Sequence, residues 1–522
     1  MIHIIKCSFI AISIWILSGT FNYSFSQQTN KSPKPIDWKL ADSLKKKIEA
    51  LPDSLSYHRA YLKAIGWTGE LYWHAEEFQS RFDSTENEMQ NQYAKWLKQF
   101  PKTAAVYEAI GSAFYESESP KATVYLKKAI ELNPKNAEIY LKLAIDAERW
   151  GKQQAAEEYM RLASVTDPEN PAYSFYYAMY FDEKDINLFR QKIDALVKKN
   201  PEHERGAQGM YWLGVAVKNR EEKIKVYEEL LEKYPPEKSN WSFSGMYKLF
   251  DLYLFEKKYT AAVQLAERLK AKQGWLDYLA FAKGITYIQE LIDNQHFKPA
   301  YDSISKIKAA RFNKFLSITV LLEAELANKT GNTDAAYKKL VELFAKNPTD
   351  ELQNAITIYA GKLNKAPATV KKDIWEVRNK SVKPAYPFEL GLYTSAKNAK
   401  LSDYKGKVVL LTFWFPGCGP CRAEFPHFEN VVKKFKGNEL AYLGINVFPK
   451  QDDYVLPFMK GTNYSFTPLK ATSEWAEKNY GVRGEPTNFL IDKEGNIVYA
   501  NFRIDQENER TLELMINSLF EK

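Results

Sequence analysis

Residues 414–421 read Trp-Phe-Pro-Gly-Cys-Gly-Pro-Cys, and this stretch decides the fold of the C-terminal part of the chain. The sequence contains 3 cysteines, and one of them, Cys7, lies in a predicted signal peptide. Removal of that peptide leaves Cys418 and Cys421 as the only thiols in the chain. Two thiols at this spacing can form a disulfide with each other and exchange it with a partner. We therefore predict a site of dithiol–disulfide exchange.

The residues around the dithiol predict a strand that leads into a helix. Residues 407–414 form a short apolar run, as expected of a buried strand, and a helix is predicted at 420–436. The start of a helix favours an anion, so we expect a stabilised Cys418 thiolate with a pKa below that of free cysteine. Cys421 follows one turn later on the same face. Cys418 is the predicted nucleophile and Cys421 the buried resolving thiol.

The two residues between the cysteines suit this position. Gly419 allows a partner chain to approach closely, and Pro420 lacks only an N–H that the first helical turn does not use. We therefore predict that both residues contact the substrate.

Further strands and helices alternate after the dithiol. Apolar runs predict strands at 440–447, 487–492 and 496–499, the last two forming a hairpin. Helices are predicted at 451–460, 473–480 and 506–521. This alternation predicts an α/β fold.

Several motifs in order make residues 384–522 similar to a known family. Residues 401–411 lead into the strand that ends at Trp414, the CGPC turn and Arg422-Ala-Glu-Phe-Pro follow, and residues 480–492 contain Gly-Glu-Pro-Thr. This region resembles the thioredoxin superfamily and, within it, the extracytoplasmic TlpA/ResA-type proteins. The resemblance implies a thioredoxin-like fold in which Pro486 is a cis-proline facing the disulfide, and it implies substrate contacts for Trp414. The alternative for Pro486 is a trans proline that opens the strand after it.

Two acidic residues are predicted to adjust the dithiol. Thioredoxin carries a buried aspartate where this chain has Thr412, so Glu424 is the predicted replacement as a proton relay. Glu485 directly precedes Pro486 and is expected to face the site and the substrate. A nearby negative charge raises the pKa of a thiol. The alternative for each acid is a solvated surface position, and His427 is predicted to be a surface residue.

Prolines mark a repeat in the first two thirds of the chain. The spacings between successive members are 33, 34, 33 and 34 residues for Pro101, Pro134, Pro168, Pro201 and Pro235. A period near 34 resembles that of tetratricopeptide helical hairpins. We predict an all-α helical solenoid over 37–365, with linkers at 27–36 and 366–383, and an α/β thioredoxin-like domain after them.

The predicted solenoid suggests a binding role. Stacked hairpins leave an extended surface on which a protein partner can bind. The aromatic run at 173–181 fits either such a groove or simply the repeat core, and the core is the better interpretation.

The N-terminal sequence predicts where the protein is located, and the composition indicates which kinds of ligand it does not bind. A basic start, an apolar run over 7–17 and small residues at 24 and 26 predict a signal peptide at 1–26, or alternatively an uncleaved anchor. The chain is therefore expected outside the cytoplasm, in the periplasm. Its net charge of +8 is spread over interspersed residues, and its 6 histidines are scattered. We expect no nucleic acid, metal or cofactor.

These observations predict an extracytoplasmic protein thiol–disulfide oxidoreductase. Its predicted partners are protein dithiol or disulfide clients, a membrane electron donor and a protein bound to the helical repeats. One alternative is an interaction scaffold with a redox-sensing thioredoxin-like domain. Another is a peroxiredoxin-type peroxidase, which shares the fold. The sequence leaves the direction of electron transfer open.

Overall fold

The computed structural model describes residues 36–67, 79–182, 184–304, 306–307, 316–435, 437 and 439–520. The predicted signal peptide at 1–26 and all but the last residue of the predicted linker at 27–36 lie outside the described residues.

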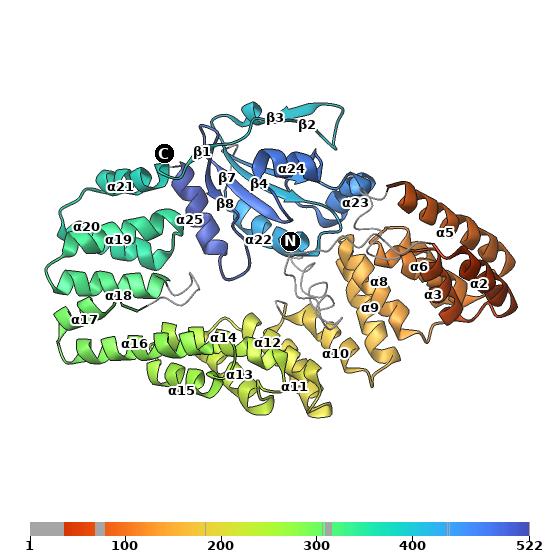
Figure 1. The fold of residues 1–522 in the computed structure, drawn as a ribbon, viewed down its shortest axis with the longest axis horizontal. Helices are drawn as coiled ribbons and strands as arrows, with labels where there is room; N and C mark the ends of the chain where they lie inside the picture. Colours follow the sequence, from red (N-terminus) through yellow and green to blue (C-terminus); the bar gives the residue numbers. More distant parts are fainter. Residues whose placement is uncertain are drawn as a thin grey trace. The chain divides into compact units, whose positions relative to one another are not determined.

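The N-terminal two thirds of the chain is a succession of α-helices that pack as neighbouring pairs (Figure 1). The predicted helical array is therefore confirmed. Its helices are α2 (Trp38–Ala50), α3 (Leu55–Ala64), α5 (Gln79–Gln99), α6 (Ala104–Glu116), α7 (Ala122–Leu132), α8 (Ala137–Arg149), α9 (Gln153–Thr166), α10 (Pro171–Ala178), α11 (Ile186–Lys199), α12 (Glu204–Ala216), α13 (Arg220–Lys233), α14 (Asn240–Phe255), α15 (Tyr259–Leu269), α16 (Trp275–Asp293), α17 (Phe297–Ile304), α18 (Leu316–Lys329), α19 (Thr333–Lys346), α20 (Asp350–Lys362) and α21 (Pro367–Asn379).

The α8–α9 pair shows why these residues form hairpins. Asn136 caps the start of α8, where its side chain accepts hydrogen bonds from the first free backbone N–H groups. Gly151 makes the turn with a φ of +69°, a left-handed conformation that favours glycine. Ala144 and Ala156 are fully buried, and their small side chains let the two helices approach closely. Local sequence thus fixes both the turn and the packing face.

The aromatic run at 173–181 belongs mainly to the core. Four of its rings are almost fully buried, and the 3-10 helix η1 (Met179–Phe181) ends the run. The interpretation as repeat core is therefore supported for the buried members, which are Tyr173, Phe175, Tyr176 and Tyr180.

The predicted linker at 366–383 is wrong as a description of the structure, because most of it is helix α21. Pro367 occupies the first turn of α21, where its missing N–H costs no hydrogen bond. The buried Arg378 donates from Nε to the carbonyl oxygen of Ala345 at 3.1 Å, which fixes α21 to α19. The helical region therefore extends to residue 379.

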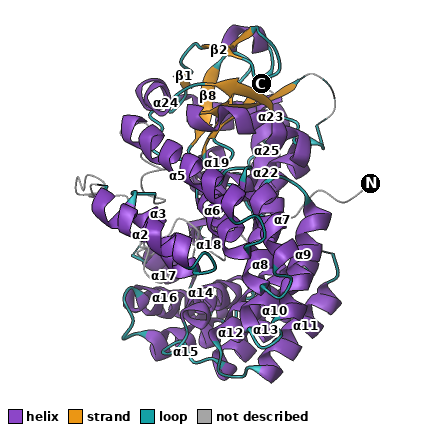
Figure 2. Ribbon diagram, turned by 90° about the vertical axis from the view of Figure 1, so that its right-hand side faces the viewer, coloured by secondary structure: helices purple, strands orange, loops and turns teal. Residues whose placement is uncertain are grey.

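The C-terminal region contains a six-stranded sheet with the strand order β1-β8-β7-β4-β5-β6. Strand β4 is central, runs parallel to β5 and antiparallel to β7, and has all seven residues buried. Figure 2 shows the strands gathered in one part of the structure. The strands are β1 (Lys383–Pro384), β4 (Val408–Trp414), β5 (Leu440–Asn446), β6 (Thr467–Lys470), β7 (Thr487–Ile491) and β8 (Asn496–Ala500), and a separate ribbon pairs β2 (Glu389–Gly391) with β3 (Asn398–Lys400).

The predicted C-terminal elements all exist, so the α/β prediction is confirmed. The helices are α22 (Gly419–Val432), α23 (Asp452–Thr462), α24 (Ser473–Tyr480) and α25 (Glu509–Phe520). The short strands β1, β2, β3 and β6 were not predicted.

The chain divides into two compact units that do not follow the predicted domain boundary. The first unit contains the residues up to Tyr180 together with Phe415–Pro426 and Lys450–Tyr464, and the second contains the rest. The dithiol segment and α23 therefore form one compact body with the first helical hairpins. Among the described helices, none is both long and apolar enough to cross a membrane.

Candidate active site

Cys418 and Cys421 are joined by a disulfide at the start of α22, with their Cα atoms 5.3 Å apart. The backbone N–H of Cys421 points at Cys418 and donates a hydrogen bond to its Sγ at 3.2 Å. Free N–H groups of a first helical turn stabilise negative charge. The local structure is therefore suited to a thiolate at Cys418 after reduction.

The dithiol is covered. Cys418 is 3% exposed and Cys421 is fully buried. Between them, Gly419 is half-buried and Pro420 is exposed. The burial of Cys421 agrees with its predicted resolving role, whereas a nucleophile that attacks protein clients is expected to be more accessible than Cys418.

Three contacts fix the segment before and after the dithiol. The N–H of Gly417 donates to Oε1 of Gln451 at 2.6 Å, and Arg422 donates from Nη1 to the carbonyl oxygen of Pro416 at 2.9 Å. The ring of Phe425 packs against Tyr464, with ring centroids 5.4 Å apart. The disulfide therefore lies in a segment held on both sides.

A buried charge cluster from the helical region reaches this segment. Oε2 of Glu118, in the loop after α6, lies 3.8 Å from Nη1 of Arg422, and its Oε1 lies 3.5 Å from Nη2 of Arg149. All three side chains are at least nine-tenths buried. The sequence analysis missed Glu118 and Arg149, because neither lies near the dithiol in sequence. Glu118 has a φ of +53°, a left-handed backbone conformation that is unusual for this residue type.

Glu148 belongs to the same cluster. It is 2% exposed and accepts a hydrogen bond from the hydroxyl of Tyr180. Burial raises the pKa of Glu148 to about 8, although the Tyr180 hydrogen bond and the positive charges of Arg422 and Arg149 oppose the rise. Glu148 is therefore a second acid of the helical region whose pKa depends on a charge of the active-site helix, that of Arg422 on α22.

Neither of the two predicted acids is a solvated surface residue. Glu424 is 5% exposed and follows Cys421 by three positions on α22, a spacing at which helix side chains are neighbours. Glu485 is half-buried just before β7, and burial raises its pKa. The Glu485–Pro486 peptide bond is cis, and Pro486 is buried.

Two predictions about neighbouring residues need correction. Trp414 is fully buried and packs edge-on against Phe466, with ring centroids 5.0 Å apart, so this ring is not available for substrate contact. His427 is not a surface residue, because it is 5% exposed and its Nδ1 lies 2.8 Å from Oε1 of Glu509 on α25. Burial acts to raise the pKa of Glu509, but hydrogen bonds from His427 and Asn430 outweigh it and lower that pKa. Long-range packing decides both positions.

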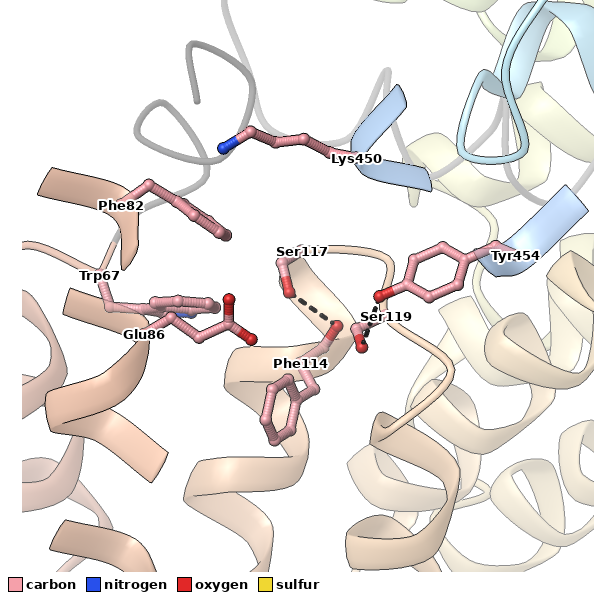
Figure 3. Close-up of a pocket in the computed structure, with 8 residues that line it drawn as sticks. All are labelled: Trp67, Phe82, Glu86, Phe114, Ser117, Ser119, Lys450 and Tyr454. Carbon is pink, nitrogen blue, oxygen red and sulfur yellow. Dashed lines mark hydrogen bonds between the residues drawn. The ribbon is translucent and has the colours of Figure 1, made fainter. Parts of the chain in front are cut away.

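A pocket of about 160 Å³ is lined in part by Lys450, the neighbour in sequence of Gln451, which holds the dithiol segment (Figure 3). Its lining combines aromatic rings of the helical region with polar groups, and Nζ of Lys450 lies 4.2 Å from the centre of the Phe82 ring. Among the described residues, no group of three or more His, Cys, Asp or Glu side chains could hold a metal ion. The lining residues are Trp67, Phe82, Glu86, Phe114, Ser117, Ser119, Lys450 and Tyr454.

The C-terminal region is similar in sequence to known proteins. Residues 383–500 match the AhpC/TSA family. The thiol-disulfide oxidoreductase ResA of Bacillus subtilis is 38% identical over 105 residues, which cover 20% of this chain and 58% of that protein. A solved structure, the exposed lipoprotein thioredoxin of Streptococcus pneumoniae, is 30% identical, with 26% of this chain and 99% of that chain covered and a TM-score of 0.23.

A second relative shows to which family this chain belongs. The chain spans less than two thirds of the length of the ResA relative, but it covers 72% of the thioredoxin-like protein YneN of Bacillus subtilis. The two are 31% identical over 124 residues, which is 23% of this chain. Through its C-terminal region, this chain belongs to the thioredoxin-like family.

Proposed function

We propose that the protein is a thiol–disulfide oxidoreductase that exchanges disulfides with protein clients through Cys418 and Cys421. The observation that carries the proposal is the hydrogen bond from the Cys421 N–H to Sγ of Cys418 at the start of a helix. This arrangement stabilises the thiolate, which is the reactive form in exchange. The similarity to named thiol–disulfide oxidoreductases supports the same function.

The exchange transfers two electrons and can run in either direction. With the reduced protein, the Cys418 thiolate attacks one sulfur of a client disulfide, and a mixed disulfide forms while the other client sulfur leaves as a thiolate. Cys421 loses its proton and attacks Sγ of Cys418, which releases the second client thiol and closes the Cys418–Cys421 disulfide. Glu424, three residues from Cys421, is the proposed acceptor of that proton. A second dithiol then restores the reduced form.

The other parts of the chain have proposed supporting roles. We place the protein outside the cytoplasm on the basis of residues 1–26, which have the composition of a signal peptide. Pro486 and Glu485 are proposed to bind the client backbone beside the dithiol, as the family resemblance implies. The helical region, which resembles tetratricopeptide arrays, is proposed to hold a protein partner, and a membrane protein is the proposed electron donor.

Reduction of insulin by dithiothreitol tests the function. The full chain is expected to accelerate it, whereas a Cys418→Ser variant is expected to give only the rate of dithiothreitol alone, because it has no nucleophile. Equal rates for the two proteins would exclude the enzyme and favour the scaffold. A parallel assay of hydrogen peroxide consumption separates the oxidoreductase from a peroxidase, which would consume peroxide and leave insulin intact.

The two predicted acids, Glu424 and Glu485, are expected to raise the pKa of Cys418. Replacement by glutamine in Glu424→Gln or Glu485→Gln removes a negative charge, which favours the thiolate and should lower that pKa by roughly one unit. The measurement is the rate of Cys418 alkylation against pH in the reduced protein. Glu477→Gln, an exposed position on α24, is the matched control. An unchanged curve in both variants would remove these acids from the mechanism.

A further inference from the structure

Two loops of the helical region contact the C-terminal region within the first compact unit, one at the dithiol segment and one at α23. We call residues 117–119, between α6 and α7, and residues 150–151, between α8 and α9, the cover loops. They meet the residues just before the disulfide, the first turn of α22 and helix α23. Neither loop lies near any of these in sequence.

The first cover loop places a carboxylate against the dithiol segment. Glu118 contacts Gly417, the residue before Cys418, so closely that a Cβ at Gly417 would collide with Oε2 of Glu118. The same carboxylate lies between the guanidinium groups of Arg422 and Arg149. Arg422 in turn donates to the carbonyl oxygen of Pro416. One buried ion cluster therefore ties both sides of the disulfide to the helical region.

The second cover loop lies directly on α23. A Cβ at Gly461 would collide with the carbonyl oxygen of Trp150, and a Cβ at Gly151 would collide with the backbone of Gly461. The ring of Trp150 packs edge-on against Tyr454 with centroids 5.6 Å apart. The hydroxyl of Tyr454 donates to Oγ of Ser119 in the first cover loop at 3.2 Å (Figure 3). The two loops thus meet at Tyr454 of α23.

These contacts conflict with exchange on a protein client. In exchange, the attacking sulfur must reach the sulfur that it attacks, so a client backbone has to come close to Cys418. Cys418 is 3% exposed, and the side chains of Glu118 and Gln451 both lie against the residue before it. On the basis of the proposed function, we propose that the cover loops close the dithiol, and that Cys418 reacts with protein clients only after the loops separate from α22 and α23.

The contact between the cover loops and the C-terminal region is made of groups that allow it to open. Buried ion pairs contribute little net stability, because desolvation opposes their attraction. The pocket of about 160 Å³ leaves part of the contact between the helical region and residues 450–454 unfilled. The dithiol segment keeps its own contacts when the loops leave, since Gln451 and Pro416, which hold it, both belong to the C-terminal region.

A Gly461→Ala variant tests the cover loops. Alanine is favourable within α23, but its Cβ cannot coexist with the carbonyl oxygen of Trp150, so the variant should favour the open form. In the reduced full chain, labelling of Cys418 by a maleimide with a polyethylene glycol chain should accelerate by about tenfold, the order expected for overpacking a contact. The matched control is Gly361→Ala, also near the end of a helix, where an added Cβ meets nothing within 4 Å. Labelling is followed by mass spectrometry of the Cys418 peptide.

Glu118→Gln gives an independent test if Gly461→Ala does not fold. It removes the charge that holds Arg422 and Arg149 and is also expected to accelerate labelling of Cys418. Rates equal to those of the unmodified chain in both variants, or an equal increase in Gly361→Ala, would overturn the proposal. If labelling of Cys418 accelerates in the variants but neither they nor the unmodified chain reduce insulin, the proposal about the cover loops stands. The oxidoreductase function is then refuted instead.

Discussion

A Cys421→Ser variant is expected to accumulate as a stable mixed disulfide between Cys418 and its protein clients. The reason is that Cys421 is the group that attacks the mixed disulfide and releases the client, and serine cannot do so. Nearly all turnover in insulin reduction should be lost, although the first attack by Cys418 remains. The variant therefore stops the reaction at the complex that identifies the client.

The measurement is non-reducing electrophoresis of the tagged variant recovered from cells, followed by mass spectrometry of the trapped partners. The control is a Cys418→Ser/Cys421→Ser double variant, which should trap nothing. Partners that appear equally with both proteins would contradict the assignment of Cys418 as nucleophile. Adding Gly461→Ala to the trap should increase the yield of mixed disulfides if the cover loops limit access.

Local sequence was sufficient to predict the dithiol and the elements that carry it. The apolar run at 407–414, the turn and the helix after it depend on neighbouring residues, and β4 and α22 appear where they were expected. The cis bond before Pro486 followed from the family resemblance and from no local rule.

Contacts between distant segments could not be predicted. Glu118 and Arg422 are surface-type residues in sequence, and only folding brings them together in a buried pair. His427 was placed on the surface for the same reason, since its partner Glu509 lies on another helix. The pair Ala366-Pro367 was interpreted as the start of a linker, although proline is equally suited to the first turn of a helix. In each case the residue type allowed two environments, and tertiary packing chose one.

The placement of Glu148 leads to a prediction about pH. This acid has an ordinary pKa of 4.5, and burial raises it to about 8 in the folded chain. Between these values the folded state retains a proton that the unfolded state has lost, so the contribution of Glu148 to folding stability falls as pH rises. The full contribution is present below pH 4.5 and is lost as the pH increases towards 8. At most, the loss is about 1.4 kcal/mol for each pH unit in this range.

Glu148→Gln should flatten that dependence, because an amide keeps no ionisable proton and can still accept the hydrogen bond from Tyr180. The free energy of unfolding in urea, measured at several pH values between 4.5 and 8, is expected to decline in the unmodified chain and to decline much less in the variant. Glu131→Gln, an exposed position on α7, should behave like the unmodified chain. Parallel curves for all three proteins would show that Glu148 is ionised in the fold. Its carboxylate would then add a negative charge beside Arg149 and Arg422. The cover loops would in that case be held more tightly at neutral pH than they are with an uncharged Glu148.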